Sequence, residues 1–247
     1  MIFVKRILSK GLVGLFIAAG VMLGLTVTNI STASAAGDEA KIVRGGIMYD
    51  KWYAITTGDI PRKTNKAYPS TAKKKGKNTW RCKECHGWDY QGAKGAYGNK
   101  KNSHYTGIKG ISGSAGADLA KIVAILKDKN HNYTDDMMTK DDFNDLALFV
   151  SKGQVDVPKV ISLDKKVSGD AVKGAAYYGT ICANCHGVDG KKIKEMPAMG
   201  KVANSNPWET LHKIRMGQPG ENMPALMALP LQISVDIVAY TKTLPKE

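Results

Sequence analysis

The four cysteines of this chain lie in two copies of one short motif. Each copy places two thiols three positions apart and a histidine directly after the second thiol: Cys82, Cys85 and His86, then Cys182, Cys185 and His186. Two C-x-x-C pairs can bind one zinc ion, but zinc ribbons separate their pairs by only roughly 15–20 residues. The pairs here are 100 positions apart. Neither zinc nor two short disulfides would account for the adjacent histidines.

The C-x-x-C-H pattern is typical of covalent haem attachment. Two thiols at this spacing add to the vinyl groups of one haem, and the following histidine turns its imidazole to the iron. The sequence therefore predicts two covalently bound haem c groups. The cysteines of each motif are the expected tethers, and His86 and His186 are the expected proximal iron ligands.

The N-terminus has the composition of an export signal. Three basic residues precede an apolar stretch at residues 11–27, and Ala33-Ser34-Ala35 follows. This order is typical of a secretory signal peptide with its cleavage site, here residues 1–35. We expect cleavage after Ala35 and a periplasmic or other extracytoplasmic location. Membrane association through an uncleaved N-terminal segment is the alternative.

The chain is basic, with a formal net charge of +14, or +11 without the first 35 residues, which hold three basic and no acidic residues. Such a charge predicts steering towards redox protein partners with an acidic docking surface. Nucleic acid is not an expected partner, because the sequence has no nucleic-acid-binding motif. The predicted extracytoplasmic location also argues against a nucleic-acid partner.

The predicted fold class is all-α, in two tandem domains. Apolar periodicity predicts helices at residues 42–56 and 141–151 around the first motif, and neither half shows sustained period-two alternation. We place the first domain at residues 36–155, a linker at 156–168 and the second domain at 169–247. The first domain also contains a basic insertion at residues 61–78, which is expected to form a surface loop.

Two local features refine this prediction. Thr139 can cap the closing helix of the first domain together with Asp142, three positions on. In the second domain, helices are predicted at residues 169–178 and 233–244. Gly174 and Tyr240 are expected to mark the point where these two helices cross.

The second half resembles the class I cytochrome c fold. The resemblance covers nearly all of residues 169–244 and rests on the opening helix, C-x-x-C-H-G, irregular loops, Met223-Pro224 and the closing helix. Residues 80–90 are similar to the N-terminal domain of bacterial dihaem c-type cytochromes. The resemblance implies that residues 217–224 form a methionine loop. Met223 is then the sixth ligand of the second iron, because Pro224 keeps it out of helical geometry.

The sixth ligand of the first iron is less clearly marked. In a class I domain the methionine precedes the closing helix, which points to Met137, with Met138 and His131 as alternatives. His104 is expected to form hydrogen bonds in a loop. A methionine ligand would raise the potential of this haem, whereas ligation by His131 would place it lower and create a downhill step between the two haems.

A further helix is predicted at residues 207–216. From it Trp208 and Arg215 can reach haem propionates, since guanidinium binds carboxylate bidentately. The alternative is a surface helix with Arg215 in solvent.

These features predict a carrier of single electrons, either a shuttle or a subunit of a larger oxidoreductase, and not an enzyme. The alternative is a dihaem enzyme of peroxidase or sulfur-compound-oxidising type, or a gas sensor. Each of these would use an open coordination position at the first haem. A cysteine iron ligand is not expected, because all four cysteines are assigned as tethers.

Overall fold

A computed structural model describes residues 30–247, with side chains from Gly37 onward. Long irregular segments join the helices of this part of the chain, which are α1 (Ile30–Lys51), α2 (Cys82–His86), α3 (Leu119–Leu126), α4 (Lys140–Leu148), α5 (Ala171–Tyr177), α6 (Ala183–His186), α7 (Met199–Ser205), α8 (Pro207–Met216) and α9 (Leu231–Thr241). Between residues 30 and 247 there are two isolated β-bridges and no strand. The all-α prediction is confirmed for this part.

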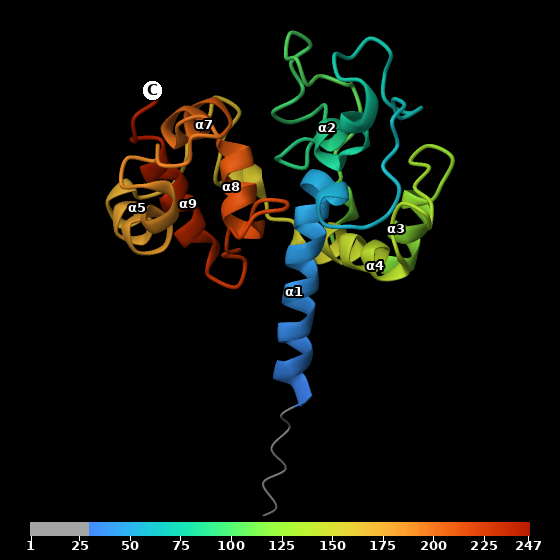
Figure 1. Cartoon of the computed structure of the whole chain (residues 1–247), viewed down its shortest axis with the longest axis horizontal. Coiled ribbons are helices and arrows are strands. Elements are labelled where there is room, and N and C mark those ends of the chain that lie inside the picture. Colours follow the sequence, from blue (N-terminus) through green and yellow to red (C-terminus); the bar gives the residue numbers. More distant parts are fainter. Residues whose placement is uncertain (1–29) are drawn as a thin grey trace, which may run out of the picture.

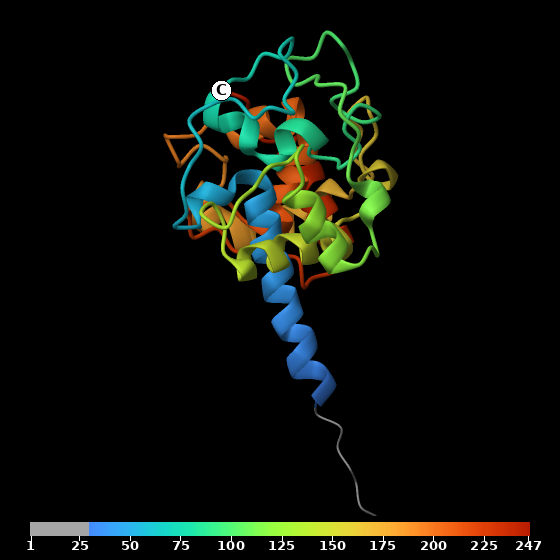
Figure 2. The ribbon, with the colours of Figure 1, turned by 90° about the vertical axis from the view of Figure 1, so that its right-hand side faces the viewer.

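The helices fall into two groups, which form the two lobes of Figure 1. In the N-terminal unit, α1–α4, the opening helix α1 and the helix α3 both pack against α4. In the C-terminal unit, α5–α9, α5 packs against α9, and α8 contacts both α7 and α9. The units meet where α1 contacts α8. Seen after a turn of 90°, one unit lies in front of the other, and the start of α1 projects away from both (Figure 2).

The opening helix α1 starts earlier than predicted, at Ile30, and ends at Lys51 in a 3-10 turn, Trp52–Ala54. Its C-terminal part carries the buried side chains of Met48 and Tyr49, and Trp52 of the following turn is buried as well. The predicted cleavage position after Ala35 lies within α1, and residues 1–29 of the predicted signal segment lie outside the described residues. Among residues 30–247, no helix combines the length and the apolar character needed to cross a membrane.

The closing helix α4 agrees with its prediction. It continues into a π-helical turn, Phe149–Gly153, and its predicted apolar face is buried. The predicted cap at Thr139 is confirmed as a capping box. The hydroxyl of Thr139 accepts from the amide of Asp142 (3.2 Å), and the carboxylate of Asp142 accepts from the amide of Thr139 (2.8 Å). The start of α4 is therefore fixed by its own sequence.

Both units cross their opening and closing helices at a glycine. A Cβ atom on Gly45 would lie 2.1 Å from the carbonyl oxygen of Asp145, and one on Gly174 would lie 2.0 Å from that of Asp236. A Cβ at Gly174 would also lie 2.9 Å from that of Tyr240, so the predicted crossing is confirmed. Only glycine permits this approach of two backbones.

The two connecting segments are more closely packed than their sequences indicate. Residues 156–168 run from one unit to the other, yet Val157 and Ile161 are buried. The insertion at residues 61–78 is irregular up to the 3-10 turn Gly76–Trp80, as expected of a surface loop. It nevertheless buries Asn65 and Tyr68, because the loop folds back over the N-terminal unit.

Candidate haem-binding sites

The two C-x-x-C-H motifs adopt the same local structure. Each ends a short helix, α2 or α6, and each is followed by a glycine with positive φ, 78° at Gly87 and 81° at Gly187. The amide of Gly87 donates to the carbonyl of Lys83 (3.0 Å), and that of Gly187 to the carbonyl of Ala183 (2.8 Å). Glycine allows the chain to turn away directly after the histidine.

A tyrosine of the opening segment anchors each motif. The hydroxyl of Tyr49 on α1 donates to the carbonyl of Gly87 (2.6 Å). The hydroxyl of Tyr178, directly after α5, donates to the carbonyl of Gly187 (2.7 Å). Each tyrosine lies four residues after the glycine of its helix crossing. One arrangement of helix, tyrosine and glycine carbonyl thus positions both motifs.

The ring of His86 is oriented for metal binding. Its Nδ1 lies 2.7 Å from the carbonyl oxygen of Lys109, so this nitrogen carries the proton and donates it. The remaining nitrogen, Nε2, has the lone pair that an iron ligand needs. Burial lowers the pKa of His86 to about 4, which keeps the imidazole neutral.

His131 lies beside His86. Their ring centres are 6.1 Å apart and their planes are inclined by 25°. The Nδ1 of His131 is 3.3 Å from a carboxylate oxygen of Asp128. Met138 is buried within the core, and Met137 is partly buried against that core. The ring that the structure brings next to His86 is therefore that of His131, although the position along the sequence pointed to Met137.

His104 acts as a hydrogen-bonding residue, as predicted. Its Nδ1 lies 3.1 Å from a carboxylate oxygen of Glu84, and its ring stacks on Tyr97 with centres 4.8 Å apart.

The second motif has its histidine half-buried, with Cys182 partly buried and Cys185 exposed. The Nδ1 atom of His186 is buried and has no hydrogen-bond partner among the described residues. Met223 lies in the loop between α8 and α9, which starts at Gly217 with φ of 90°. The amide of Leu226 donates to the carbonyl of Ile214 (3.0 Å), so this loop folds back onto α8.

Arg215 on α8 is 7% exposed, so the alternative of a solvent-facing Arg215 is wrong. Its Nη2 donates to the carbonyl of Met227 (3.2 Å), whereas Nε and Nη1 are buried without a partner among residues 30–247. A buried guanidinium with unpaired donors is costly, and a carboxylate would satisfy it. The propionates of a haem supply such carboxylates. Trp208 on the same helix is also buried.

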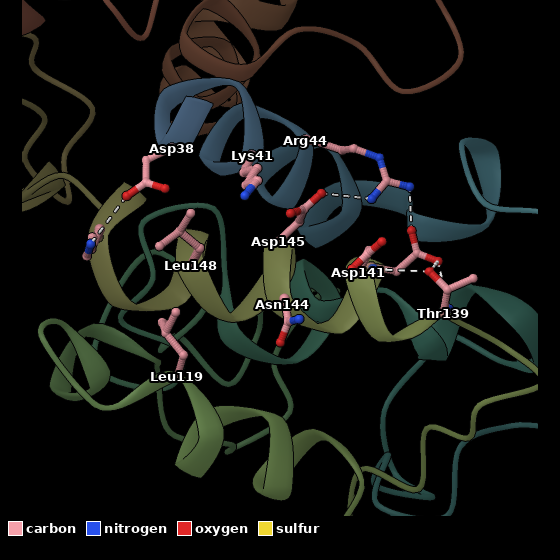
Figure 3. Close-up of a pocket in the computed structure, with 11 residues that line it drawn as sticks. Asp38, Lys41, Arg44, Leu119, Thr139, Asp141, Asn144, Asp145 and Leu148 are labelled. Carbon is pink, nitrogen blue, oxygen red and sulfur yellow. Dashed lines mark hydrogen bonds and ion pairs between the residues drawn. The ribbon is translucent and has the colours of Figure 1, made fainter. Parts of the chain in front are cut away.

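A charged groove lies between α1 and α4 (Figure 3). Across it, Arg44 forms ion pairs with Asp142 and with Asp145, the latter at 2.9 Å. The groove contains no residue of either C-x-x-C-H motif. We interpret these ion pairs as contacts that stabilise the packing of the opening helix against the closing helix of the N-terminal unit.

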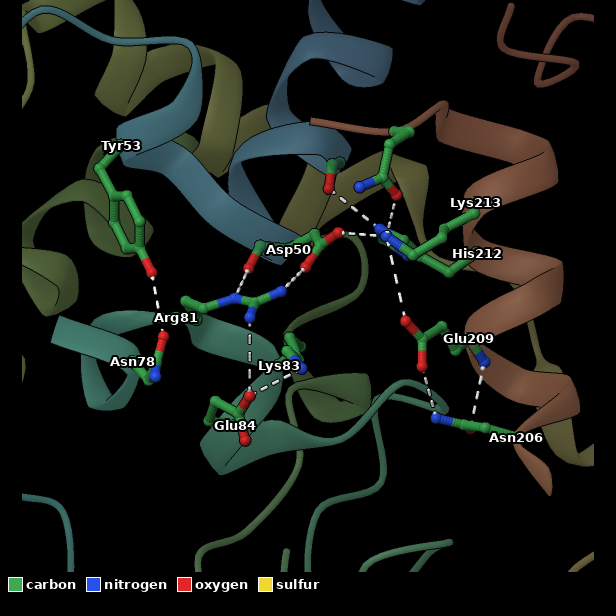
Figure 4. A network of polar contacts seen from close by, with 12 residues as sticks. Asp50, Tyr53, Asn78, Arg81, Lys83, Glu84, Asn206, Glu209, His212 and Lys213 are labelled. Atoms are coloured by element: carbon green, nitrogen blue, oxygen red, sulfur yellow. Dashed lines mark hydrogen bonds and ion pairs between the residues drawn. The ribbon is translucent and has the colours of Figure 1, made fainter. Parts of the chain in front are cut away.

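A network of buried charges connects the first motif to the C-terminal unit (Figure 4). Asp50, 1% exposed, forms ion pairs with Arg81, the residue before Cys82, and with Lys213 on α8 at 2.7 Å. Burial alone would raise the pKa of Asp50, but the charges of Lys213 and Arg81 outweigh it and lower this pKa. Asp50 therefore joins the two units as a carboxylate.

The two variable residues of the first motif extend this network. Lys83 and Glu84 are buried, and Lys83 Nζ lies 2.7 Å from a carboxylate oxygen of Glu84. Burial would raise the pKa of Glu84, but the hydrogen bonds from His104 and Lys83 and the charge of Lys83 lower it to about 2. Sequence reasoning assigned these two residues no role.

A second link between the units runs through Tyr90 and His212. The hydroxyl of Tyr90 lies 2.9 Å from His212 Nδ1, and His212 Nε2 lies 3.0 Å from the carbonyl oxygen of Gly46 on α1. All three groups are buried at the contact between α1 and α8. Tyr90 has a φ of 65°, unusual for a residue with a side chain, which marks it as held by its surroundings.

Residues 171–229, from the start of α5 to the loop before α9, match the protein family described as Cytochrome c. Neither curated proteins nor solved structures include a match to the chain. A cytochrome c domain at these residues supports a c-type cytochrome with covalently bound haem c and haem-based electron transfer. The predicted resemblance is thus confirmed for the greater part of the C-terminal unit.

Proposed function

We propose that this protein is an exported dihaem c-type cytochrome that transfers single electrons between redox proteins, as a free shuttle or as a subunit of a larger oxidoreductase. The observation that carries the proposal is the repetition of one local structure around both C-x-x-C-H motifs. One of the two copies lies inside the region that matches the Cytochrome c family.

The repetition involves contacts that short motifs do not require. Each unit has a glycine at the helix crossing, a tyrosine four residues later, and a hydrogen bond from that tyrosine to the glycine after the motif. In each unit an aspartate of the closing helix supplies the carbonyl that meets the crossing glycine. Two unrelated folds would not share this set, so the N-terminal unit supports a second cytochrome c domain and a second haem.

The residues present fit two haems. The thiols of each motif would tether one group, His86 and His186 would bind iron, and Met223 would complete the second site. The buried donors of Arg215 fit the propionates of the second haem, and Trp208 is buried on the same helix. When bound, each haem supplies an iron that exchanges one electron. The protein positions the two groups, tunes them and excludes water.

Location and partners follow from the N-terminal segment and the charge. The signal-like residues 1–35 support an extracytoplasmic site, where haem attachment of this kind takes place. A formal net charge of +11 after cleavage supports docking to an acidic redox partner.

Haem counting tests the proposal. The protein, exported in a host that attaches c-type haem, is assayed by alkaline pyridine spectra and by intact mass. We expect two haems per chain. The double variants Cys82→Ala/Cys85→Ala and Cys182→Ala/Cys185→Ala should each retain one. A wild-type chain with one haem, or with none, would refute the dihaem proposal.

A further inference from the structure

Two imidazole rings meet in the N-terminal unit at a spacing suited to one metal ion. A metal–imidazole bond is about 2 Å long and the nitrogen lies about 1 Å from its ring centre, so two imidazoles on opposite sides of one ion have centres about 6 Å apart. The centres of the His86 and His131 rings are 6.1 Å apart, with planes inclined by only 25°. The distance between the ring centres is therefore the one expected of two imidazoles that bind the same ion.

Both rings have the outer contacts of metal ligands. A ligating histidine keeps its second N–H on a backbone carbonyl or a carboxylate, which fixes the tautomer and the direction of the ring. The Nδ1 of His86 lies 2.7 Å from the carbonyl oxygen of Lys109. That of His131 lies 3.3 Å from a carboxylate oxygen of Asp128. In each ring, Nε2 is left as the nitrogen for a metal.

The backbone at His131 is held from two directions. The carboxylate of Asp128 accepts from the amides of Asn130 and His131, both at 2.8 Å. From the other side, the side-chain amide of Asn65 donates to the carbonyl of His131 (3.2 Å). The next residue, Asn132, has a φ of 56°, which turns the chain sharply. The ring of His131 is therefore positioned by a turn that hydrogen bonds hold in place.

The methionines nearby are less suited to this position. Met138 is 1% exposed and belongs to the hydrophobic core. Met137 packs against that core, and its carbonyl oxygen would lie 2.1 Å from a Cβ atom on Gly58, so its backbone is in close contact with another segment.

We infer that His131, in place of Met137, is the sixth iron ligand in the N-terminal unit, which makes the first haem bis-histidine-ligated beside a methionine-ligated second haem. This inference rests on the proposed dihaem function. A methionine ligand raises the potential of a c-type haem. The N-terminal haem is then the low-potential member of the pair, and electrons pass downhill from it to the C-terminal haem.

Electron paramagnetic resonance of the oxidised protein and the methionine-to-iron charge-transfer band test the assignment. We expect one bis-histidine signal per chain, and a charge-transfer band with half the amplitude per haem of an all-methionine cytochrome. His131→Gly should lose the bis-histidine signal, and added imidazole should restore it. Met137→Leu, the matched control, should change neither spectrum.

Other outcomes decide against the assignment. Loss of charge-transfer intensity in Met137→Leu would assign the site to Met137. A wild-type band that reports two methionine ligands would exclude His131 as the ligand. An unchanged bis-histidine signal in His131→Gly would also overturn the inference. Haem content is counted in every sample, so that a chain with one haem is recognised as failure of the dihaem proposal and not of the ligand assignment.

Discussion

Replacing Asp50 by asparagine should loosen the contact between the two units. Asp50 is 1% exposed, and its carboxylate lies between Arg81 of the N-terminal unit and Lys213 of the C-terminal unit. Asp50→Asn keeps the shape of the side chain but removes its charge. Two cations from different units would then face each other without the carboxylate between them, and each would keep only a longer contact of 4.0 Å, Arg81 with Glu84 and Lys213 with Glu209.

The cost can be approximated from this geometry. Removing one partner of a buried ion pair typically costs about 3–5 kcal/mol. Arg81 and Lys213 are 20% and 19% exposed, so water relieves part of the loss. We therefore expect the free energy of unfolding to fall by about 3 kcal/mol, at the lower end of that range. For a chain of this size such a loss lowers Tm by about 6–12 °C.

The stabilisation that Asp50 contributes should weaken only when the pH falls. The pKa of Asp50 is lowered in the folded protein from its ordinary value of 3.8, because the charges of Lys213 and Arg81 outweigh the effect of burial. The stability that this carboxylate contributes is thus fully present above its unfolded pKa and is lost as pH falls through the lower folded pKa. The wild-type advantage over Asp50→Asn should be constant near neutral pH and should shrink only below about pH 4.

Thermal and urea unfolding of the haem-loaded protein, followed by circular dichroism, measure this difference. Asp156→Asn is the matched control, because Asp156 is exposed and its ion pair is with Lys159 in its own segment. It should leave Tm unchanged. Equal Tm values for wild type and Asp50→Asn at pH 7, or a difference that grows on acidification, would refute the reasoning.

Three further predictions concern single sites. Tyr49→Phe and Tyr178→Phe each remove a donor to a glycine carbonyl, so each should lower the free energy of unfolding in urea by about 1–2 kcal/mol. Gly174→Ala forces two backbones apart and should cost about 3 kcal/mol or more, whereas Gly179→Ala, with open space around it, should cost little. Arg215→Gln removes a buried positive charge that we propose lies beside the second haem, which should lower the potential of that haem in a spectroelectrochemical titration.

Each of these has its own contrary result. A tyrosine effect confined to one unit would contradict the equivalence of the two motifs. An unaffected Gly174→Ala would mean that the helices do not cross at this glycine. If Arg215→Gln shifted the potential of the first haem alone, Arg215 would not belong to the second site.

The helices whose bounds were predicted best from the sequence have strong capping and termination signals. The predicted helix at residues 207–216 has the observed bounds of α8. Asn206 caps it by accepting from the amide of Glu209 (3.3 Å), Pro207 occupies its first position, and Gly217 ends it with positive φ. These signals act within a few residues, so they can be recognised without tertiary structure. The start of α1 has no comparable marker, and its prediction at residue 42 missed the first turns of the helix.

Features that depend on distant segments were not predictable in the same way. Met137 was preferred as a ligand because of its position before the closing helix, yet the approach of His131 to His86 depends on how a loop 45 residues downstream folds back. The paired Asp50 and Lys213 are 163 positions apart and resemble ordinary surface charges in sequence. The repeated glycine and tyrosine at a spacing of four, in contrast, was present in both opening segments and could have been recognised as a sign of duplication.

The contact between α1 and α8 connects the two proposed haem sites. Tyr90 lies four residues after His86, and its hydroxyl meets His212 on α8. Arg215, one helical turn further along α8, is close enough to Tyr90 for the two to influence each other's pKa. The donors expected to hold the second haem's propionates therefore lie on the side of the C-terminal unit that faces the first motif. A change that shifts α8 against α1, such as Asp50→Asn, should consequently slow electron exchange between the two haems even where both retain their ligands. Flash reduction of wild type and variant would measure this rate, and equal rates would mean that the charged contact stabilises the protein without setting the distance between the haems.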